Sequence, residues 1–219
     1  MKKILFTLVA MALTFATTFG KGGYETAMHY AIDSLYSAQT VSDFNSVANM
    51  FERIGNAEKD RWLPYYYSAY AYTMMSTQER DKSLVDGYLD KAEAHMDKSE
   101  KLKGDKVELL ALRAFANMMR IGVDPATRGQ EYSMKSVGYL QQAMQIDNIN
   151  PRVVLMMGQM QYGTAQFFGS GTGEACSTFL NAKELFEKEA NSDRGLLPAW
   201  GKPQAEGMLK MCSETTEDN

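Results

Sequence analysis

Histidine and cysteine are scarce in this chain of 219 residues, which contains two of each. His29 and His95 do not stand at metal-ligand spacing, and the cysteines do not form a C-x-x-C pair. The motifs G-x-S-x-G and H-E-x-x-H are absent as well. These absences disfavour zinc enzymes, thiol redox enzymes and serine hydrolases. We therefore expect no enzymatic activity, no bound metal and no cofactor.

Basic clusters and long apolar runs are also lacking. The 23 lysine and arginine residues are outnumbered by 27 aspartate and glutamate residues, which gives a net charge of -4. This acidity disfavours nucleic acids and anionic membrane surfaces as partners, because both attract clustered positive charge. Beyond the N-terminal segment, no stretch reaches the roughly 20 apolar residues that a membrane span needs.

The N-terminal segment MKKILFTLVAMALTFATTFG has the three parts of a secretory signal peptide. Two lysines precede an apolar run from Ile4 to about Ala16, and small residues suited to cleavage follow it. A membrane anchor is the alternative, but the run is too short to span a bilayer. We therefore predict that residues 1–20 direct export across the inner membrane, most plausibly to the periplasm. Cleavage after Ala16 and cleavage after Gly20 both fit.

Apolar residues recur at intervals of three and four along almost the whole mature chain, as in an α-helix, and no segment alternates with the period of two expected for a strand. The pattern predicts an all-α fold. The expected helices are 24–38, 42–58, 61–77, 82–102, 106–121, 128–147, 151–167, 174–191 and 198–213. The tail at 214–219 is acidic and without apolar residues, so we expect it to be disordered.

One helical pattern occurs four times at nearly constant spacing. Its positions, three to a group, are Val47, Phe51 and Ile54, then Ala92, Met96 and Ser99, then Ser136, Leu140 and Ala143, and last Ala182, Phe186 and Glu189. Steps of 45, 44 and 46 residues separate the groups. A small residue, Ala69, Ala114 or Gly158, recurs at similar steps in the helix before each of the last three groups. Such spacing predicts an array of two-helix units.

A small residue in one helix, followed by Ala-x-x-x-aromatic/aliphatic-x-x-Ala in the next, resembles the tetratricopeptide repeat over about residues 42–194. The best matches are Met157-Gly158 followed by Tyr162, and the stretches 136–151 and 181–190. The last three units are each about ten residues longer than the 34 of that family, and this length is similar to Sel1-type repeats. The resemblance implies a right-handed superhelical array of about four antiparallel helix hairpins with a C-terminal capping helix, in one domain at 24–213.

In tetratricopeptide arrays the first helix of each unit lines a concave groove. By that resemblance the groove residues are Tyr66, Tyr70, Ala111, Phe115, Leu155, Gln159 and Tyr162. Aromatic side chains with polar tips suit a recognition surface, although the same residues also fit the core or contacts between repeats. Because this set carries little charge, an extended peptide or an apolar ligand fits better than a highly charged one.

The two cysteines stand near the outer ends of the last two expected helices. Cys176 opens the helix at 174–191 and Cys212 closes the helix at 198–213. An antiparallel pair that turns near residues 193 and 194 brings both cysteines to the same end. In an oxidising compartment they are then expected to form a disulfide that pins the last helix. Two buried free thiols are the alternative.

Methionine and glycine each allow two interpretations. The 16 methionines include pairs at 74–75, 118–119 and 156–157. A methionine-rich surface suits adaptable binding or copper capture, but the helical spacing of these pairs favours core filling. Gly169, Gly171 and Gly173 resemble a phosphate loop only superficially, since no strand precedes them and no Lys-Ser/Thr follows. A flexible connection between helices is the better interpretation.

Taken together, the sequence predicts an exported, non-enzymatic scaffold that binds a protein or peptide partner on its concave face. The alternative is a periplasmic component that binds a small apolar ligand and works beside a transporter.

Overall fold

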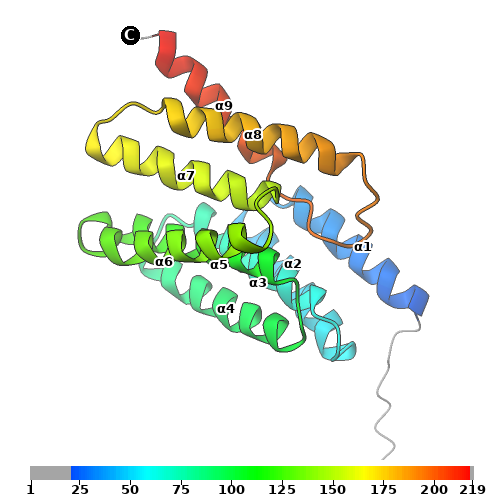
Figure 1. The fold of residues 1–219 in the computed structure, drawn as a ribbon. Coiled ribbons are helices and arrows are strands. Elements are labelled where there is room, and N and C mark those ends of the chain that lie inside the picture. Colours follow the sequence, from blue (N-terminus) through cyan, green and yellow to red (C-terminus); the bar gives the residue numbers. More distant parts are fainter. Residues whose placement is uncertain (1–20, 218–219) are drawn as a thin grey trace, which may run out of the picture.

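The computed structural model describes residues 21–217, and within this range the chain forms nine α-helices and no β-strand (Figure 1). The helices are α1 Lys21–Ser37, α2 Val41–Ala57, α3 Leu63–Gln78, α4 Lys82–Lys101, α5 Lys106–Val123, α6 Pro125–Ile146, α7 Pro151–Phe168, α8 Gly173–Ala190 and α9 Lys202–Glu217. The all-α prediction is confirmed for this part of the chain. The expected signal peptide at 1–20 lies outside the described residues.

The last helix differs most from the prediction. α9 begins at Lys202 instead of 198, because Gly201 has a φ of 115°, which no helix accommodates. It then runs on to Glu217, so residues 214–217 are helical where we expected a disordered tail. The first eight helices begin and end within about three residues of their predicted positions, which is the usual uncertainty of helix ends.

Helices that follow one another in sequence pack against each other, as hairpins do. α2 contacts α3, α3 contacts α4, α5 contacts α6, and α7 contacts α8. The odd-numbered helices α3, α5 and α7 also lie side by side, since α3 contacts α5 and α5 contacts α7. This row of three helices positions the site described below. The repeat family and the handedness of the array stay predictions.

The repeated sequence positions are the places where the helices bury their apolar faces. Every residue of the four groups named above is buried except Glu189. The small residues between them allow close approach. A Cβ atom on Gly158, for example, would lie 2.7 Å from the ring of Phe179. The regular spacing therefore marks core positions. Glu189, the one charged residue in the four groups, has a separate role that is described below.

The C-terminal part is closed by a covalent link. Cys176 in α8 and Cys212 in α9 form a disulfide, with Cα atoms 5.9 Å apart. The predicted bond is therefore confirmed, and the alternative of two free thiols is wrong. The bond fastens the C-terminal part of α9 to the start of α8, the helix on which α9 chiefly packs.

Candidate ligand-binding groove

An open cavity of about 650 Å³ lies among α3, α4, α5, α7 and α9. We call it the groove. Its lining residues are Met74, Ser76, Thr77, Gln78, Glu79, Lys82, Val85, Phe115, Met118, Met119, Gly122, Val123, Gln159, Tyr162, Gly163, Gln204 and Met208. Small-molecule sites in proteins usually have volumes of about 300 to 1,000 Å³. The groove is therefore large enough to hold a ligand of the size of a cofactor.

α5 contributes the most regular part of this lining. Phe115, Met118, Met119 and Gly122 are spaced so that they share one face of the helix. Phe115 is buried, while Met118 and Met119 are half-exposed. A Cβ atom on Gly122 would meet no other atom within 4 Å, so nothing fills the groove at this point. The result is an apolar stripe that is open to an incoming molecule.

Methionine is the residue type that occurs most often in the lining, with Met74, Met118, Met119 and Met208. The prediction of core filling holds only in part for Met74, Met118 and Met119, which pack against the core and also line the groove. It holds for Met75 and Met156, which are 3% and 1% exposed. Thioether side chains are flexible and polarisable, and they make favourable contacts with aromatic rings. The groove is thus suited to an apolar or aromatic molecule.

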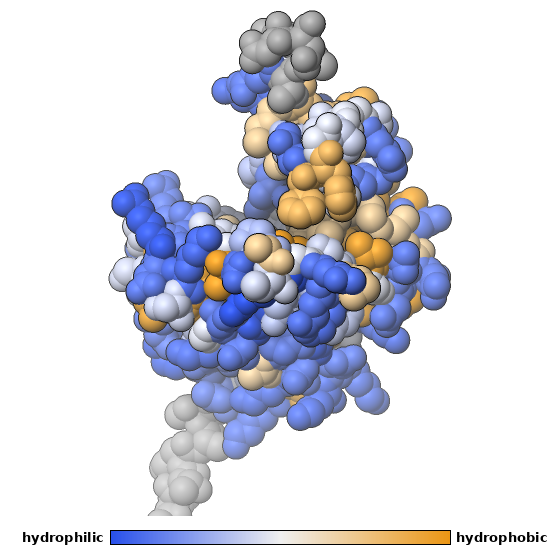
Figure 2. Space-filling view, turned by 90° about the vertical axis from the view of Figure 1, so that its left-hand side faces the viewer, coloured by the Kyte–Doolittle hydropathy of each residue, from blue (hydrophilic) through white to orange (hydrophobic). Residues whose placement is uncertain are grey.

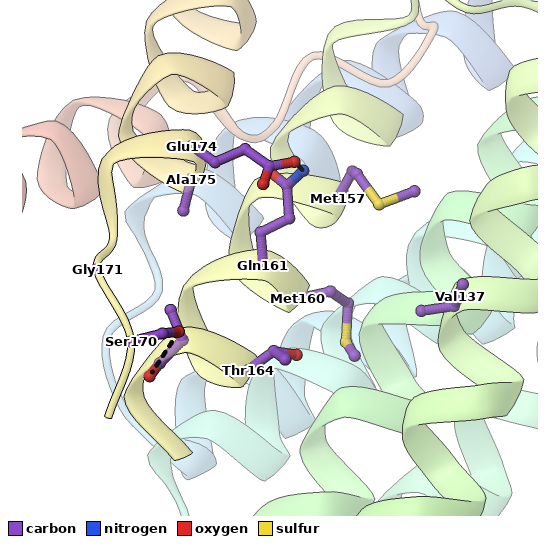
Figure 3. Close-up of a pocket in the computed structure, with 10 residues that line it drawn as sticks. Val137, Met157, Met160, Gln161, Thr164, Ser170, Gly171, Glu174 and Ala175 are labelled. Atoms are coloured by element: carbon purple, nitrogen blue, oxygen red, sulfur yellow. Dashed lines mark hydrogen bonds between the residues drawn. The ribbon is translucent and has the colours of Figure 1, made fainter. Parts of the chain in front are cut away.

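A smaller cleft of about 270 Å³ is lined by residues of α6, α7 and α8 and of the connection between α7 and α8 (Figure 3). Tyr162 lines the groove, whereas Met160 and Gln161 line the cleft, because neighbouring positions on a helix point about 100° apart. Figure 3 shows Gln161 of α7 reaching toward Glu174 of α8, and its Nε2 donates to the Glu174 carboxylate at 2.9 Å. Because this cleft is small and two of its polar side chains, Gln161 and Glu174, already bond to each other, the groove is the better candidate site.

The seven groove residues expected from the sequence fall into two sets. Phe115, Gln159 and Tyr162 line the groove. Tyr66, Tyr70, Ala111 and Leu155 are at most 3% exposed and do not line it. The two sets come from the same row of helices, α3, α5 and α7. One half of this row is therefore open, and the other half is sealed.

Trp200, in the connection between α8 and α9, occupies the sealed half. Its ring stacks on Tyr70 with centroids 5.0 Å apart and lies 6.0 Å from the ring of Phe115. Its indole N–H donates to the hydroxyl of Tyr66 at 2.7 Å. Next to it, a Cβ atom on Gly201 would lie 2.4 Å from the ring of Phe186, so only glycine fits here. The connection can therefore press Trp200 into the row of helices.

Buried charges hold this half of the molecule together. The side chain of Arg152 in α7 is fully buried, and it donates to Glu108 of α5 at 2.7 Å and to Glu189 of α8 at 2.6 Å. Burial opposes its charge, but hydrogen bonds to Glu189 and the charge of Glu108 outweigh this effect and raise the pKa of the Arg152 guanidinium. For Tyr66, burial disfavours the charged phenolate and therefore raises the pKa of its hydroxyl well above the usual range. Glu189 departs from the small residue of the repeat pattern because it supplies this ion pair.

Most of the residues that line the groove belong to the last turns of α3 and α5 and to the later part of α7. These parts lie toward the end of the molecule where the α5–α6 and α7–α8 connections are, at the left of Figure 1. Figure 2 shows the molecule from this end, with hydrophobic residues on its upper part and in the region just below. Phe167 and Phe168, at the last turn of α7, are 73% and 75% exposed, with ring centroids 5.0 Å apart. Phe167 lies one turn beyond Gly163, so exposed aromatic surface adjoins the groove.

Neither histidine belongs to the groove. His95 is packed between the rings of Tyr65 and Tyr72, and its Nε2 lies 3.0 Å from Glu52. His29 is exposed on α1. Between residues 21 and 217, no cluster of three His, Cys, Asp or Glu side chains could hold a metal ion. No helix in this range is long and apolar enough to cross a membrane.

The sequence alone did not reveal the two charged residues of the groove, Glu79 and Lys82, or the contribution of α9. The groove positions of Met74, Met118 and Met119 had a signal in their helical register, because each follows the expected groove positions by three or four residues. Gln204 and Met208 had none, since the last helix was expected only to cap the array and no groove position was assigned to it.

Comparison with known structures finds a similarity to the HusA haemophore from Porphyromonas gingivalis, with a TM-score of 0.78 and 28% sequence identity. The match covers 90% of this chain and 96% of that chain. No family model matches the sequence. No curated protein matches it either.

Proposed function

We propose that this protein is an exported carrier that holds haem, or a related flat tetrapyrrole, in the groove. The observation that carries the proposal is the likeness to a haemophore, a protein named for binding haem, over 90% of the chain with a TM-score of 0.78. Only about a tenth of the chain lies outside the match, so most of the helices that line the groove lie within it. The alternative of a small apolar ligand is thereby favoured over a protein or peptide partner.

The chemistry of the groove supports this ligand class. A tetrapyrrole is a flat, conjugated and largely apolar disc with carboxylates at one edge. Met118 and Met119 offer polarisable surface to such a disc, and Tyr162 offers an aromatic ring. Gly122 and Gly163 leave room beside them, because a Cβ atom on either would meet nothing within 4 Å. A disc therefore finds apolar contact without displacing the helices.

Export is supported by two independent features. Residues 1–20 have the pattern of a signal peptide. Cys176 and Cys212 form a disulfide, and such bonds persist in oxidising compartments such as the bacterial periplasm and the cell exterior. We therefore place the carrier outside the cytoplasm, with the periplasm as the compartment expected from the sequence.

We propose binding without catalysis. The residues that line the groove include no histidine or cysteine, and Glu79 is their one carboxylate. Nucleophilic or acid–base catalysis usually needs a nucleophile and a base within hydrogen-bond reach of each other. The tetratricopeptide-like architecture is part of the same proposal, and the burial of the repeated positions supports it.

A protein or peptide partner is the second candidate, because Phe167 and Phe168 expose an aromatic pair beside the groove. Exposed apolar surface of this kind often marks contact with another protein. This candidate predicts a partner recovered by crosslinking from the periplasm and no tetrapyrrole bound to the purified protein.

The substitution Gly163→Trp tests the proposed function by filling the groove. An indole at this position would occupy the space that a tetrapyrrole needs. It should not disturb the fold, because the new Cβ atom would have no neighbouring atom within 4 Å. We expect the affinity for haemin, measured by absorbance titration, to fall by at least about tenfold, which corresponds to about 1.4 kcal/mol.

The matched control is Gly87→Trp in α4, where a Cβ atom also meets nothing within 4 Å and which does not line the groove. Haemin affinity of this variant should equal that of the unsubstituted protein. Equal haemin affinity in both variants would show that haemin does not occupy the groove. No saturable binding to the unsubstituted protein would reject the proposed function itself.

A further inference from the structure

The charges that line the groove are confined to one edge of it. Among its described lining residues, only Glu79 and Lys82 are charged. Both lie where α3 gives way to α4, with Lys82 as the first residue of α4. The remaining lining residues are apolar, glycine or uncharged polar residues. A ligand that carries charge at one end would therefore meet a matching charge only at this edge.

The carboxylates near Lys82 already have hydrogen-bond partners. Glu79 accepts from the backbone N–H of Asp81 at 2.9 Å and from the hydroxyl of Tyr88 at 3.0 Å, one bond to each carboxylate oxygen. Asp81 caps α4 by accepting from the backbone N–H of Ser83 at 2.9 Å and from its hydroxyl at 2.7 Å. Both acidic side chains are therefore held in place by the turn that they stabilise.

Lys82 itself is exposed, and it takes no part in the ion pairs between α4 and other described residues. Those ion pairs are made by His95 and by the carboxylates of α4. Its long side chain can therefore turn toward the groove without breaking an existing ion pair. It also stands at the N-terminus of α4, where the helix dipole favours negative charge nearby. Both effects make this edge attractive to an anion.

We propose that Lys82 determines specificity by pairing with a carboxylate at the edge of the ligand, while the apolar body of the ligand lies against the α5 stripe. This inference rests on the proposed function and deepens it. It states that the groove prefers tetrapyrroles with free propionates over equally flat tetrapyrroles without them. Lys82 thereby fixes which edge of the ligand faces the α3–α4 connection.

The test compares two probes that share one macrocycle, mesoporphyrin IX with two free propionates and its dimethyl ester, in which both are methylated and uncharged. Their dissociation constants are measured by fluorescence titration for the unsubstituted protein and for Lys82→Glu and Lys82→Arg. An exposed ion pair changes an equilibrium constant by up to about fivefold, and reversal of the charge adds repulsion. We therefore expect Lys82→Glu to weaken binding of the diacid by about tenfold and of the ester by less than about twofold. Lys82→Arg should retain the preference for the diacid.

Two controls separate this effect from unfolding and from general electrostatics. A glutamate in the first turn of α4 agrees with the helix dipole, so Lys82→Glu should not lower the melting temperature. Lys101→Glu makes the same change of charge at the other end of α4, about 28 Å away at 1.5 Å per residue. Its affinity for the diacid should remain within about twofold of the unsubstituted protein, because charges so far apart are screened.

The outcomes are distinguishable. Selective weakening of the diacid by Lys82→Glu, with Lys82→Arg and Lys101→Glu unaffected, supports the role of Lys82. Equal weakening of the diacid and the ester, or no weakening of either, overturns that role and leaves the proposed function standing. Failure of the unsubstituted protein to bind either probe overturns both.

Discussion

The row formed by α3, α5 and α7 has a sealed half and an open half, and the two differ in what covers them. In the sealed half, Tyr66 and Tyr70 are at most 3% exposed beneath Trp200. In the open half, Met118, Met119 and Tyr162 line the groove and remain half-exposed. Both halves are rich in large apolar side chains. The comparison shows that the connection between α8 and α9, more than the helices themselves, decides which surface is core and which is available to a ligand.

Phe115 marks the boundary between the halves, because it lines the groove and also lies beside the ring of Trp200. Burial of apolar surface stabilises the fold by roughly 25 cal/mol for each Å² removed from water. The sealed half has gained this free energy on folding. In the open half the same gain becomes available when a ligand covers the methionines. Stability and binding are thus assigned to neighbouring parts of one surface.

Removing the cover of the sealed half should have the largest effect. Trp200→Ala deletes a buried ring that stacks on Tyr70 and donates to Tyr66. Truncation of a buried aromatic residue to alanine usually costs about 3 to 5 kcal/mol. We expect a loss of this size in the free energy of unfolding, measured by urea denaturation and followed by circular dichroism.

The control is Trp62→Ala, since Trp62 is the other tryptophan and is only partly buried, at the start of α3. Its loss should cost clearly less than that of Trp200. If both variants lose the same stability, the connection does not seal the row of helices in the way described, and the contrast between the two halves fails.

Loss of the disulfide should have the next largest effect, and it acts on the wall of the open half. Cys212 lies one helical turn beyond Met208, which lines the groove. The bond closes a loop with a sequence separation of 36. A loop of that length contributes about 3 to 4 kcal/mol on the chain-entropy model. We expect Cys176→Ser with Cys212→Ser to lower unfolding stability by this amount and to weaken haemin binding.

Reductant provides the matched control for the disulfide. Dithiothreitol should destabilise the unsubstituted protein and leave the double-serine variant unchanged. If the double-serine variant is less stable but binds haemin with unchanged affinity, α9 stabilises the protein without shaping the groove.

The positions of the helices were predictable because their signals are local. Apolar spacing located the first eight helices to within about three residues. The repeated groups identified core positions, as the burial of Phe51, Met96 and Leu140 shows. The disulfide was predictable as well, because an antiparallel pair of helices brings Cys176 and Cys212 to one end.

The division of the row of helices into a sealed and an open half was not predictable, because it depends on contacts between distant segments. Trp200 meets Tyr66 across 134 residues of sequence. The glycine that permits this contact, Gly201, gave no local signal of its φ of 115°. The open half was predicted only in part. Phe115, Gln159 and Tyr162 line the groove as expected, whereas Met118, three residues after Phe115, was interpreted as core filling like Met156, which is 1% exposed.

The smallest expected effect concerns pH, and it distinguishes the groove side of α3 from its opposite side. On that opposite side His95 is stacked between two tyrosines of α3. Burial lowers its pKa below 6.5, and the positive charges of Lys98 and Lys91 act in the same direction, although the carboxylate of Glu52 opposes the shift. The groups that surround it are Glu52 from α2, Tyr65 and Tyr72 from α3, and Lys91 and Lys98 from α4. No residue of this cluster lines the groove.

Because the folded state favours neutral His95, the unfolded chain binds more protons as the pH falls below 6.5, and the free energy of unfolding decreases. The slope cannot exceed about 1.4 kcal/mol per pH unit for one group. We expect urea denaturation between about pH 7.5 and 5.5 to show a decrease that His95→Gln removes and His29→Gln, the control for histidine content, retains. Affinity for mesoporphyrin dimethyl ester, which has no free carboxylate, should depend on pH in the same way in His95→Gln as in the unsubstituted protein. A decrease in that affinity that His95→Gln removes would show that the two sides of α3 are coupled, and the separation of stability from binding would then be incomplete.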